Sequence, residues 1–177
     1  MSLIRGTCVF VMLVFVALSA SIGGCSDPDD SSPADVQGFN YTSYYIAQFD
    51  VANEDQTMSA AGPNIFPKDA NEARSGGGAS VCCISIPSHW RPGMKLVVTW
   101  NVDKIQDGKT PGQWYTATTD VPPYGPNTDG FWVHFLPGDR IRVQVLDKQE
   151  VPQKPDDHDP YIVQGTLDPK HNQQEIR

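Results

Sequence analysis

The chain has 177 residues, and its 21 acidic and 13 basic side chains give a formal net charge of −8 at pH 7. An acidic surface without a basic stripe repels phosphate backbones and anionic headgroups, which argues against nucleic-acid binding and against electrostatic attachment to membranes. The length, with an apolar content of 39%, suits one domain that has a core of its own.

The first 24 residues are typical of a secretion signal. An uncharged run of apolar and small residues, 7–22, follows Arg5, which is the layout of the apolar region of a signal peptide. The run ends at Gly23 and Gly24, before it reaches the roughly 20 apolar residues that a membrane-spanning helix needs. We therefore predict that residues 1–24 are a signal peptide.

Cys25 follows the two glycines directly. The stretch from Ile22 to Cys25 resembles a bacterial lipoprotein box, although Ile22 stands where such boxes most often have leucine. The resemblance implies a lipid anchor on Cys25, and Ser26 behind it implies an outer-membrane location facing the periplasm. An ordinary signal peptide followed by an unmodified cysteine is the alternative. Residues 25–37 are polar, acidic and proline-bearing, which predicts a disordered tether.

Strand signals dominate from residue 38 onward. Residues 38–51 are rich in β-branched and aromatic side chains and predict one strand, whereas 53–80 predict a long irregular segment with at most a helical turn near 70–74. Further strands are predicted at 81–86, 95–102, 113–121, 130–136, 140–146 and 161–167.

These elements predict an all-β fold. About seven strands with short turns and no helical pattern of ten residues are typical of a single antiparallel β-sandwich or a partly open barrel. We assign this β-domain to residues 38–167 and leave 168–177 as a C-terminal tail.

Cys82 and Cys83 are adjacent in a predicted strand. Neighbouring α-carbons lie about 3.8 Å apart, below the usual disulfide span of about 4.4 to 6.8 Å. Three interpretations stay open: two thiols packed as small apolar groups, a structural vicinal disulfide, or a redox pair. Too few other soft ligands lie nearby in the sequence to predict a metal site.

No catalytic motif stands out in the sequence. The four histidines share no metal-binding spacing, and the acidic segment 156–159 lacks the glycine of a calcium loop, so we interpret it as a solvated loop. Nucleophile elbows and phosphate-binding glycine loops are also missing from the sequence. We predict a protein that is not an enzyme and that uses no cofactor and no metal.

The segment 130–136 offers the best candidates for binding a partner. Alternation puts Phe131, Val133 and Phe135 on one face and the remaining aromatic side chains on the other. The partner-binding candidates are Tyr124, Asp129, Trp132 and His134. Exposed aromatic residues are enriched in binding hot spots, although a loop or a partner strand that covers Trp132 is the alternative.

Several segments together suggest a family. GFNYTSYYIAQF, GGGASVCCISIPSHWRPGMKLVVTW, VPPYG and FWVHFLPGDRIRVQV resemble a family of small proteobacterial lipoproteins of uncharacterised function. Members are often encoded beside type VI secretion lipase effectors, and some are regarded as their immunity proteins. The similarity covers about residues 38–146.

The resemblance implies a membrane-anchored periplasmic immunity protein that binds a secreted phospholipase or lipase effector and occludes it. The membrane would then be contacted through the lipid anchor alone. The alternative is a structural or secretion-accessory lipoprotein of the envelope that adds a strand to a sheet edge. An enzyme that uses Cys82 or an acidic metal site is a third and weaker hypothesis.

Overall fold

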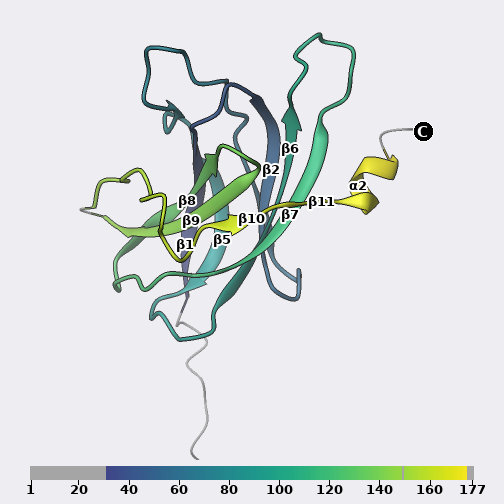
Figure 1. The fold of residues 1–177 in the computed structure, drawn as a ribbon. Helices are drawn as coiled ribbons and strands as arrows, with labels where there is room; N and C mark the ends of the chain where they lie inside the picture. Colours follow the sequence, from purple (N-terminus) through teal and green to yellow (C-terminus); the bar gives the residue numbers. More distant parts are fainter. Residues whose placement is uncertain (1–30, 149, 175–177) are drawn as a thin grey trace, which may run out of the picture. The chain divides into compact units, whose positions relative to one another are not determined.

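The computed structural model describes residues 31–148 and 150–174, without the side chains of Asp129 and Gln174, so the predicted signal peptide and Cys25 lie outside the described residues. Strands dominate this part of the chain and form two sheets that pack around a shared apolar core (Figure 1). The prediction of a β-sandwich is confirmed. In the described ranges, no helix is long and apolar enough to span a bilayer.

The first sheet has six strands in the order β10-β9-β8-β1-β4, with β5 also paired to β1. Its strands are β1 (Ser31–Asn40), β4 (Ser75–Gly76), β5 (Val81–Pro87), β8 (Thr128–Leu136), β9 (Arg140–Asp147) and β10 (Val163–Gln164). The pairing of β1 with β8 is parallel, and the others are antiparallel. Since parallel neighbours need a long connection, most of the second sheet is built between these two strands.

The second sheet has five antiparallel strands in the order β11-β7-β6-β2-β3. Its strands are β2 (Tyr45–Asn53), β3 (Ser59–Gly62), β6 (Lys95–Asp103), β7 (Gln113–Asp120) and β11 (Thr166–Leu167). β2 and β6 pair along almost their whole length, with Tyr45 opposite Asp103 at one end and Asn53 opposite Leu96 at the other. These two ends of the sandwich carry different surfaces.

The core follows from the alternation seen in the sequence. In β6, the predicted apolar face is buried, and it consists of Leu96, Val98, Trp100 and Val102. Opposite it, β8 contributes Phe131, Val133 and Phe135, all buried. Phe135 contacts both Phe49 and Trp100, with ring centroids 5.1 and 6.1 Å apart, so aromatic contacts join the two sheets.

The predicted tether is wrong for residues 31–37, because these residues begin β1. This strand lies inside the first sheet between β5 and β8, and Ala34 and Val36 are buried. The acidic and proline-rich composition concealed the alternation of these two side chains with Asp35 and Gln37. Pairing on both sides of the strand supplies the hydrogen bonds and burial that composition alone did not indicate.

The single strand predicted over 38–51 is two strands, one in each sheet. β1 ends at Asn40, the chain turns over 41–44, and β2 begins at Tyr45. The following segment is largely irregular, as predicted, and includes a turn at 70–71. It also contributes β3 and β4, two short edge strands.

The final predicted strand, 161–167, is likewise split between the sheets. β10 pairs with β9 and β11 pairs with β7, and Gly165 between them donates its N–H to Asp139 O at 2.8 Å. The C-terminal tail then forms the short helix α2 (Pro169–Gln174), whose first turn is capped by Asp168 Oδ1. The chain therefore crosses between the two sheets at this edge of the sandwich.

Candidate functional site

Trp132 belongs to a second apolar cluster on the face of the first sheet that points away from the main core. The cluster contains Phe39, Tyr41, Trp132, Leu136 and Leu146, with Ile162 packed against it. Trp132 is 8% exposed and stacks on Phe39 with ring centroids 4.9 Å apart, and the Arg74 guanidinium lies 3.7 Å from the centre of the Phe39 ring. Trp132 is therefore not an exposed binding residue, and the interpretation of a covered Trp132 is confirmed.

His134 is fully buried beside this second cluster. Its Nδ1 lies 3.1 Å from the Tyr41 hydroxyl and its Nε2 lies 3.1 Å from Gln144 Oε1. All three groups are satisfied when Tyr41 donates to Nδ1 and Nε2–H donates to Gln144. Burial lowers the pKa of His134 to about 4, against the opposing effect of Gln144. His134 is therefore a neutral structural side chain rather than a surface contact.

Tyr124 is also a structural residue. Its hydroxyl donates to Pro87 O at 2.7 Å and lies 3.7 Å from Met94 Sδ, and its ring packs against the main core. Asp129 lies in β8, but its side chain is outside the described atoms. The structure therefore does not bring the predicted partner-binding side chains together on an accessible surface, because two of them are buried and Tyr124 faces the core.

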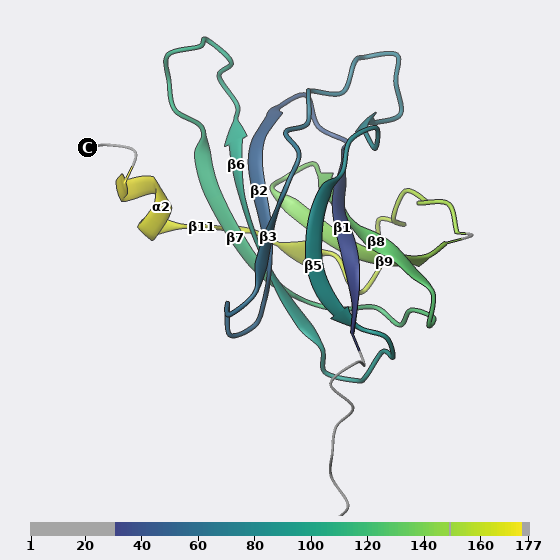
Figure 2. The same cartoon turned by 180° about the vertical axis from the view of Figure 1, so that it is seen from behind.

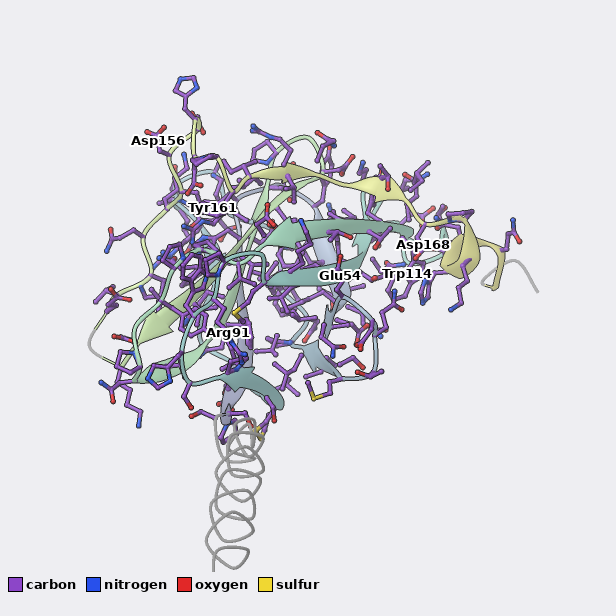
Figure 3. All side chains as sticks on the ribbon, turned by 90° about the horizontal axis from the view of Figure 1, so that it is seen from below. Glu54, Arg91, Trp114, Asp156, Tyr161 and Asp168 are labelled. Carbon is purple, nitrogen blue, oxygen red and sulfur yellow. A yellow bond between two sulfur atoms is a disulfide. The ribbon has the colours of Figure 1, made fainter. Side chains whose placement is uncertain are left out.

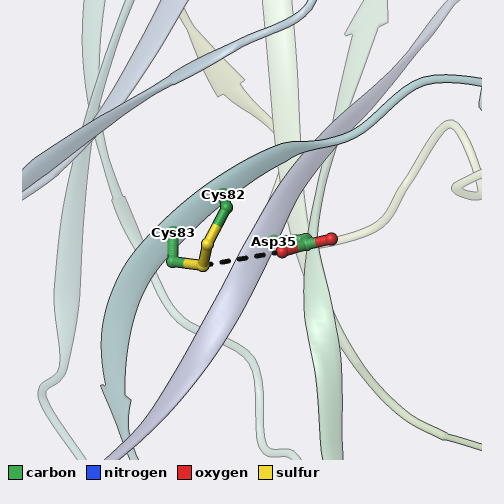
Figure 4. A group of neighbouring side chains, drawn as sticks. All are labelled: Asp35, Cys82 and Cys83. Atoms are coloured by element: carbon green, nitrogen blue, oxygen red, sulfur yellow. Dashed lines mark hydrogen bonds between the residues drawn. A yellow bond between two sulfur atoms is a disulfide. The ribbon is translucent and has the colours of Figure 1, made fainter.

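Cys82 and Cys83 lie on β5 and are joined by a disulfide, with a cis peptide bond between them (Figure 4). Cys83 Sγ lies 3.7 Å from Asp35 Oδ1, and the three side chains are close enough together to share a metal ion. A disulfide sulfur has no proton to donate and is a poor metal ligand. Hydrogen bonding to Asp35 or metal binding would therefore require the reduced thiols.

The acidic segment 156–159 has a structural role at one residue. Asp159 Oδ2 accepts a hydrogen bond from Arg142 Nε at 3.1 Å, and both side chains are largely buried. Asp156 Oδ1 accepts from His158 N within the turn. The Asp159 ion pair thus fastens this loop to β9, beside the second cluster.

The exposed aromatic side chains lie elsewhere, at the end of the sandwich where β2 begins. We call Tyr44, Tyr45, Phe66 and Ile105 the aromatic patch. Phe66 is 69% exposed and Ile105 is 62% exposed, and the rings of Tyr45 and Phe66 lie 5.5 Å apart. Gln106 Nε2 donates to Ser43 O at 2.9 Å, which holds the segment after β6 against the turn that carries Tyr44.

Asn40 fixes the backbone beneath this patch. Its side chain is fully buried, and Nδ2 donates to the carbonyls of Tyr44 and Phe66 at 2.7 and 3.0 Å. Its Oδ1 accepts from the N–H and the hydroxyl of Thr42. One amide therefore ties together two segments that lie far apart in the sequence. Because the backbone is fixed in advance, the exposed rings lose little freedom on binding.

Lys104 borders the patch with a positive charge. Its Nζ donates to Asp139 Oδ2 and to the Tyr115 hydroxyl, each at 2.8 Å, and lies 5.7 Å from the centre of the Tyr44 ring. Although burial opposes the charged form, the hydrogen bonds to Asp139 and Tyr115 raise the pKa of Lys104. The ammonium group therefore stays charged at neutral pH and connects β6 to the β8–β9 turn.

The opposite end of the sandwich holds an apolar cleft with a volume of about 640 Å³. Residues of β5 in the first sheet, of the ends of β2 and β6, and of the turn before β3 line it. Figure 2 shows the ribbons of β3 and β5 on this side of the sandwich, and the two strands are in contact. Its apolar lining comes from both sheets and their loops, and comprises Met58, Ile84, Ile86, Pro87, Met94, Leu96, Val121 and Phe131.

The polar rim of the cleft is acidic. Glu54 and Asp55 lie in the turn between β2 and β3 and are exposed; Figure 3 views the molecule from this end and labels Glu54. Hydrogen bonds from Thr57 lower the pKa of Asp55, so this carboxyl is ionised at neutral pH. Lys95 is the basic residue of the rim, and its Nζ lies 2.7 Å from Asp120 Oδ1.

These features define a small two-sheet β-sandwich with a rigid aromatic patch at one end and an apolar cleft at the other. The chain belongs to the DUF3304 family, described as proteins of unknown function, whose model matches residues 39–143. That range includes the whole aromatic patch and all the apolar residues that line the cleft. No curated protein and no solved structure matches the chain.

Neither surface is predicted by the sequence, although parts of both leave a signal in it. Tyr44 and Tyr45 follow a segment that contains Asn40, Thr42 and Ser43, polar residues that favour a turn, but the β-branched and aromatic residues around them predict a continuous strand. Phe66 lies in a segment without periodicity, so nothing in its neighbourhood indicated exposure. The cleft depends on how far apart two sheets lie at one end, which local sequence does not encode.

Proposed function

We propose that this protein is a lipid-anchored, non-enzymatic immunity protein that binds a phospholipase or lipase effector in the periplasm and blocks it. The observation that carries the proposal is the aromatic patch. The rings of Tyr44 and Phe66 are exposed, and they lie on a backbone that buried Asn40 holds in place. Rigid, exposed aromatic side chains are the typical anchors of tight protein interfaces.

Two features of the sequence support the same proposal. The stretch from Ile22 to Cys25 resembles a lipoprotein box, which would place the domain near the bilayer that a lipase attacks. The net charge of −8 would speed the capture of a partner with a basic surface. A standard interface of about 1,600 Å² in total would extend well beyond the patch, so we expect neighbouring polar residues to contribute at its rim.

The test is co-production with the effector encoded by the neighbouring gene. We expect the wild-type protein to restore growth when the effector is directed to the periplasm, and to form a complex with it in solution. Phe66→Ala and Tyr44→Ala should each weaken that complex by about tenfold or more. Leu167→Ala is the matched control, because Leu167 is a similarly exposed apolar side chain outside the patch. Absence of both rescue and complex would refute the proposal.

A second candidate function rests on the exposed edge of the first sheet. β5 pairs with β1 on one side, and Cys82, Cys83 and Ser85 are exposed on it. An envelope or secretion-accessory lipoprotein would use such an edge to add a strand from a partner. Deletion of the gene in a strain without the effector distinguishes the two proposals, since only an accessory role predicts an envelope or secretion defect there.

A further inference from the structure

We propose that the apolar cleft binds a single-chain amphiphile whose headgroup carries an amine, such as a lysophosphatidylethanolamine. This function is separate from the proposed protein interface, because the cleft and the aromatic patch lie at opposite ends of β2 and β6. Binding of an amphiphile in the cleft can therefore be tested without the effector, and failure of one proposal does not refute the other.

The size and lining of the cleft suit one apolar chain. Its volume of about 640 Å³ lies within the range of about 300 to 1,000 Å³ that is typical of small-molecule sites. Buried Ile86 and Leu96 form opposite walls from the two sheets. Met58 and Met94 are also part of the lining, and methionine side chains adapt their shape to flexible apolar ligands.

The rim selects the charge of the headgroup. Glu54 and Asp55 carry two exposed carboxylates at the mouth, while the ammonium of Lys95 is already paired with Asp120 at 2.7 Å. A free fatty acid would bring its carboxylate toward these like charges. The ammonium at the outer end of a phosphoethanolamine headgroup would be attracted to them, and it offsets the negative charge of the phosphate, so that this headgroup has no net charge. A single-chain amphiphile with an amine therefore fits better than a fatty acid of the same length.

The position of the cleft favours lipid as the source of the ligand. The described chain begins at Ser31, which pairs with Pro87 in the wall of the cleft. A fully extended segment from Cys25 to Ser31 spans at most about 20 Å. If Cys25 carries the lipid anchor, as the proposed function assumes, the cleft end therefore stays close to the bilayer. Single-chain amphiphiles that leave the bilayer would meet this end of the domain first.

The experiment measures binding of monopalmitoyl lysophosphatidylethanolamine below its micellar concentration. The protein used is the chain from residue 25 onward with the substitution Cys25→Ser, fused to a different signal peptide for export. Binding is measured by titration calorimetry and native mass spectrometry. We expect one bound molecule per chain and weaker binding of palmitate. Absence of binding by a folded protein would overturn the proposal.

Variants at the mouth test the assignment without disturbing the core. Met58 is 46% exposed, so Met58→Glu should leave the fold intact and weaken binding by about tenfold or more, whereas Met58→Leu should preserve it. Glu54→Lys combined with Asp55→Lys should shift the preference toward palmitate by about two- to fivefold. Unchanged affinities in Met58→Glu would place the ligand elsewhere, and an unchanged preference in the lysine variant would refute selection by charge.

A final experiment distinguishes an added amphiphile from the protein's own lipid as the source of the acyl chain. The lipidated protein in bilayer nanodiscs should bind the added amphiphile as the unlipidated form does. If only the unlipidated form binds it, the protein's own lipid fills the cleft, and an external ligand is refuted.

Discussion

The two ends of the sandwich are stabilised in different ways. At the end where β2 begins, the polar side chain of Asn40 donates to the backbone carbonyls of Tyr44 and Phe66. The backbone that carries these exposed rings is therefore fixed. At the other end, apolar side chains of the two sheets line an open cleft whose most exposed apolar side chain is the flexible Met58. The first arrangement suits a rigid protein partner, and the second suits an adaptable apolar ligand.

This difference shows that exposure and burial are not properties of a residue type. Trp132 stacks on Phe39 beneath a covering layer, while Phe66 lies open to solvent. Both are aromatic and both have apolar neighbours in the sequence, since Trp132 lies between Phe131 and Val133 and Phe66 lies between Ile65 and Pro67. What distinguishes them is which distant segment lies over each one. The following predictions test whether the two ends behave as separate regions.

The largest effect is expected from Trp132→Ala. Removing a buried tryptophan should lower the free energy of unfolding by about 3–5 kcal/mol, because it leaves a cavity beside Phe39 in the second cluster. Chemical denaturation followed by circular dichroism measures this loss. Phe66→Ala is the matched control, and it should change stability by less than about 0.5 kcal/mol while weakening partner binding. Equal stability of the two variants would show that Trp132 is not covered.

Asn40→Ala should have the next largest effect. It leaves the carbonyls of Tyr44 and Phe66 and the N–H of Thr42 without their side-chain partner, and we expect a loss of about 2–4 kcal/mol. Partner affinity should fall while amphiphile affinity in the cleft stays unchanged. Asn53→Ala, which removes a similar turn-stabilising amide at the cleft end, should leave partner binding intact. A parallel loss at both ends would contradict their independence.

His134 predicts a pH dependence of stability. Its folded-state pKa is lowered by burial to about 4, so the unfolded chain binds the proton more tightly than the folded chain does. Stability should therefore be fully present above about pH 6.5, fall as the pH drops toward 4, and lose about 2–3 kcal/mol in that interval. Denaturation curves between pH 4.5 and 7.5 measure the slope. In His134→Gln this slope should flatten, and an unchanged slope would assign it to other groups.

The smallest effect is expected from Tyr124→Phe. Loss of the hydroxyl that donates to Pro87 O should cost about 1 kcal/mol of stability and weaken amphiphile binding by about two- to fivefold, because Pro87 is part of the cleft wall. Titration calorimetry measures the affinity. Tyr45→Phe removes a hydroxyl that accepts from Asn64 Nδ2 at the other end and should leave the cleft unaffected. Equal changes in both variants would indicate a general loosening of the sandwich.

Much of the fold was predictable because alternation of side chains is a local property. The faces of β6, β8 and β9 follow directly from their sequences, and the structure buries the side chains that this period assigns to the core. The predictions were wrong where pairing with neighbouring strands placed a segment in a sheet although its amino-acid composition is typical of a linker. Residues 31–37 look like a linker, yet β5 pairs with residues between 31 and 36, and β8 pairs with 35–37.

The sites were much less predictable than the fold. The sequence indicated that one face of β8 was unusual, with Trp132 and His134 on it, but it did not indicate what covers that face. The loop that contains Asp159 is fastened to Arg142 of β9, and Phe39 of β1 stacks on Trp132. Both contacts come from segments that are distant in the sequence, and they convert a predicted surface into an interior.

Sequence alone determined the all-β class, most of the strands and the residues of the main core, because a two-residue period is encoded within each strand. It also supplied the hypothesis of a secreted and lipid-anchored chain. Tertiary structure decided where the chain changes sheets, which aromatic side chains remain exposed, and that an apolar cleft lies between the sheets. These outcomes depend on contacts between distant segments, since burial is a property of the assembled layers rather than of any one stretch of chain.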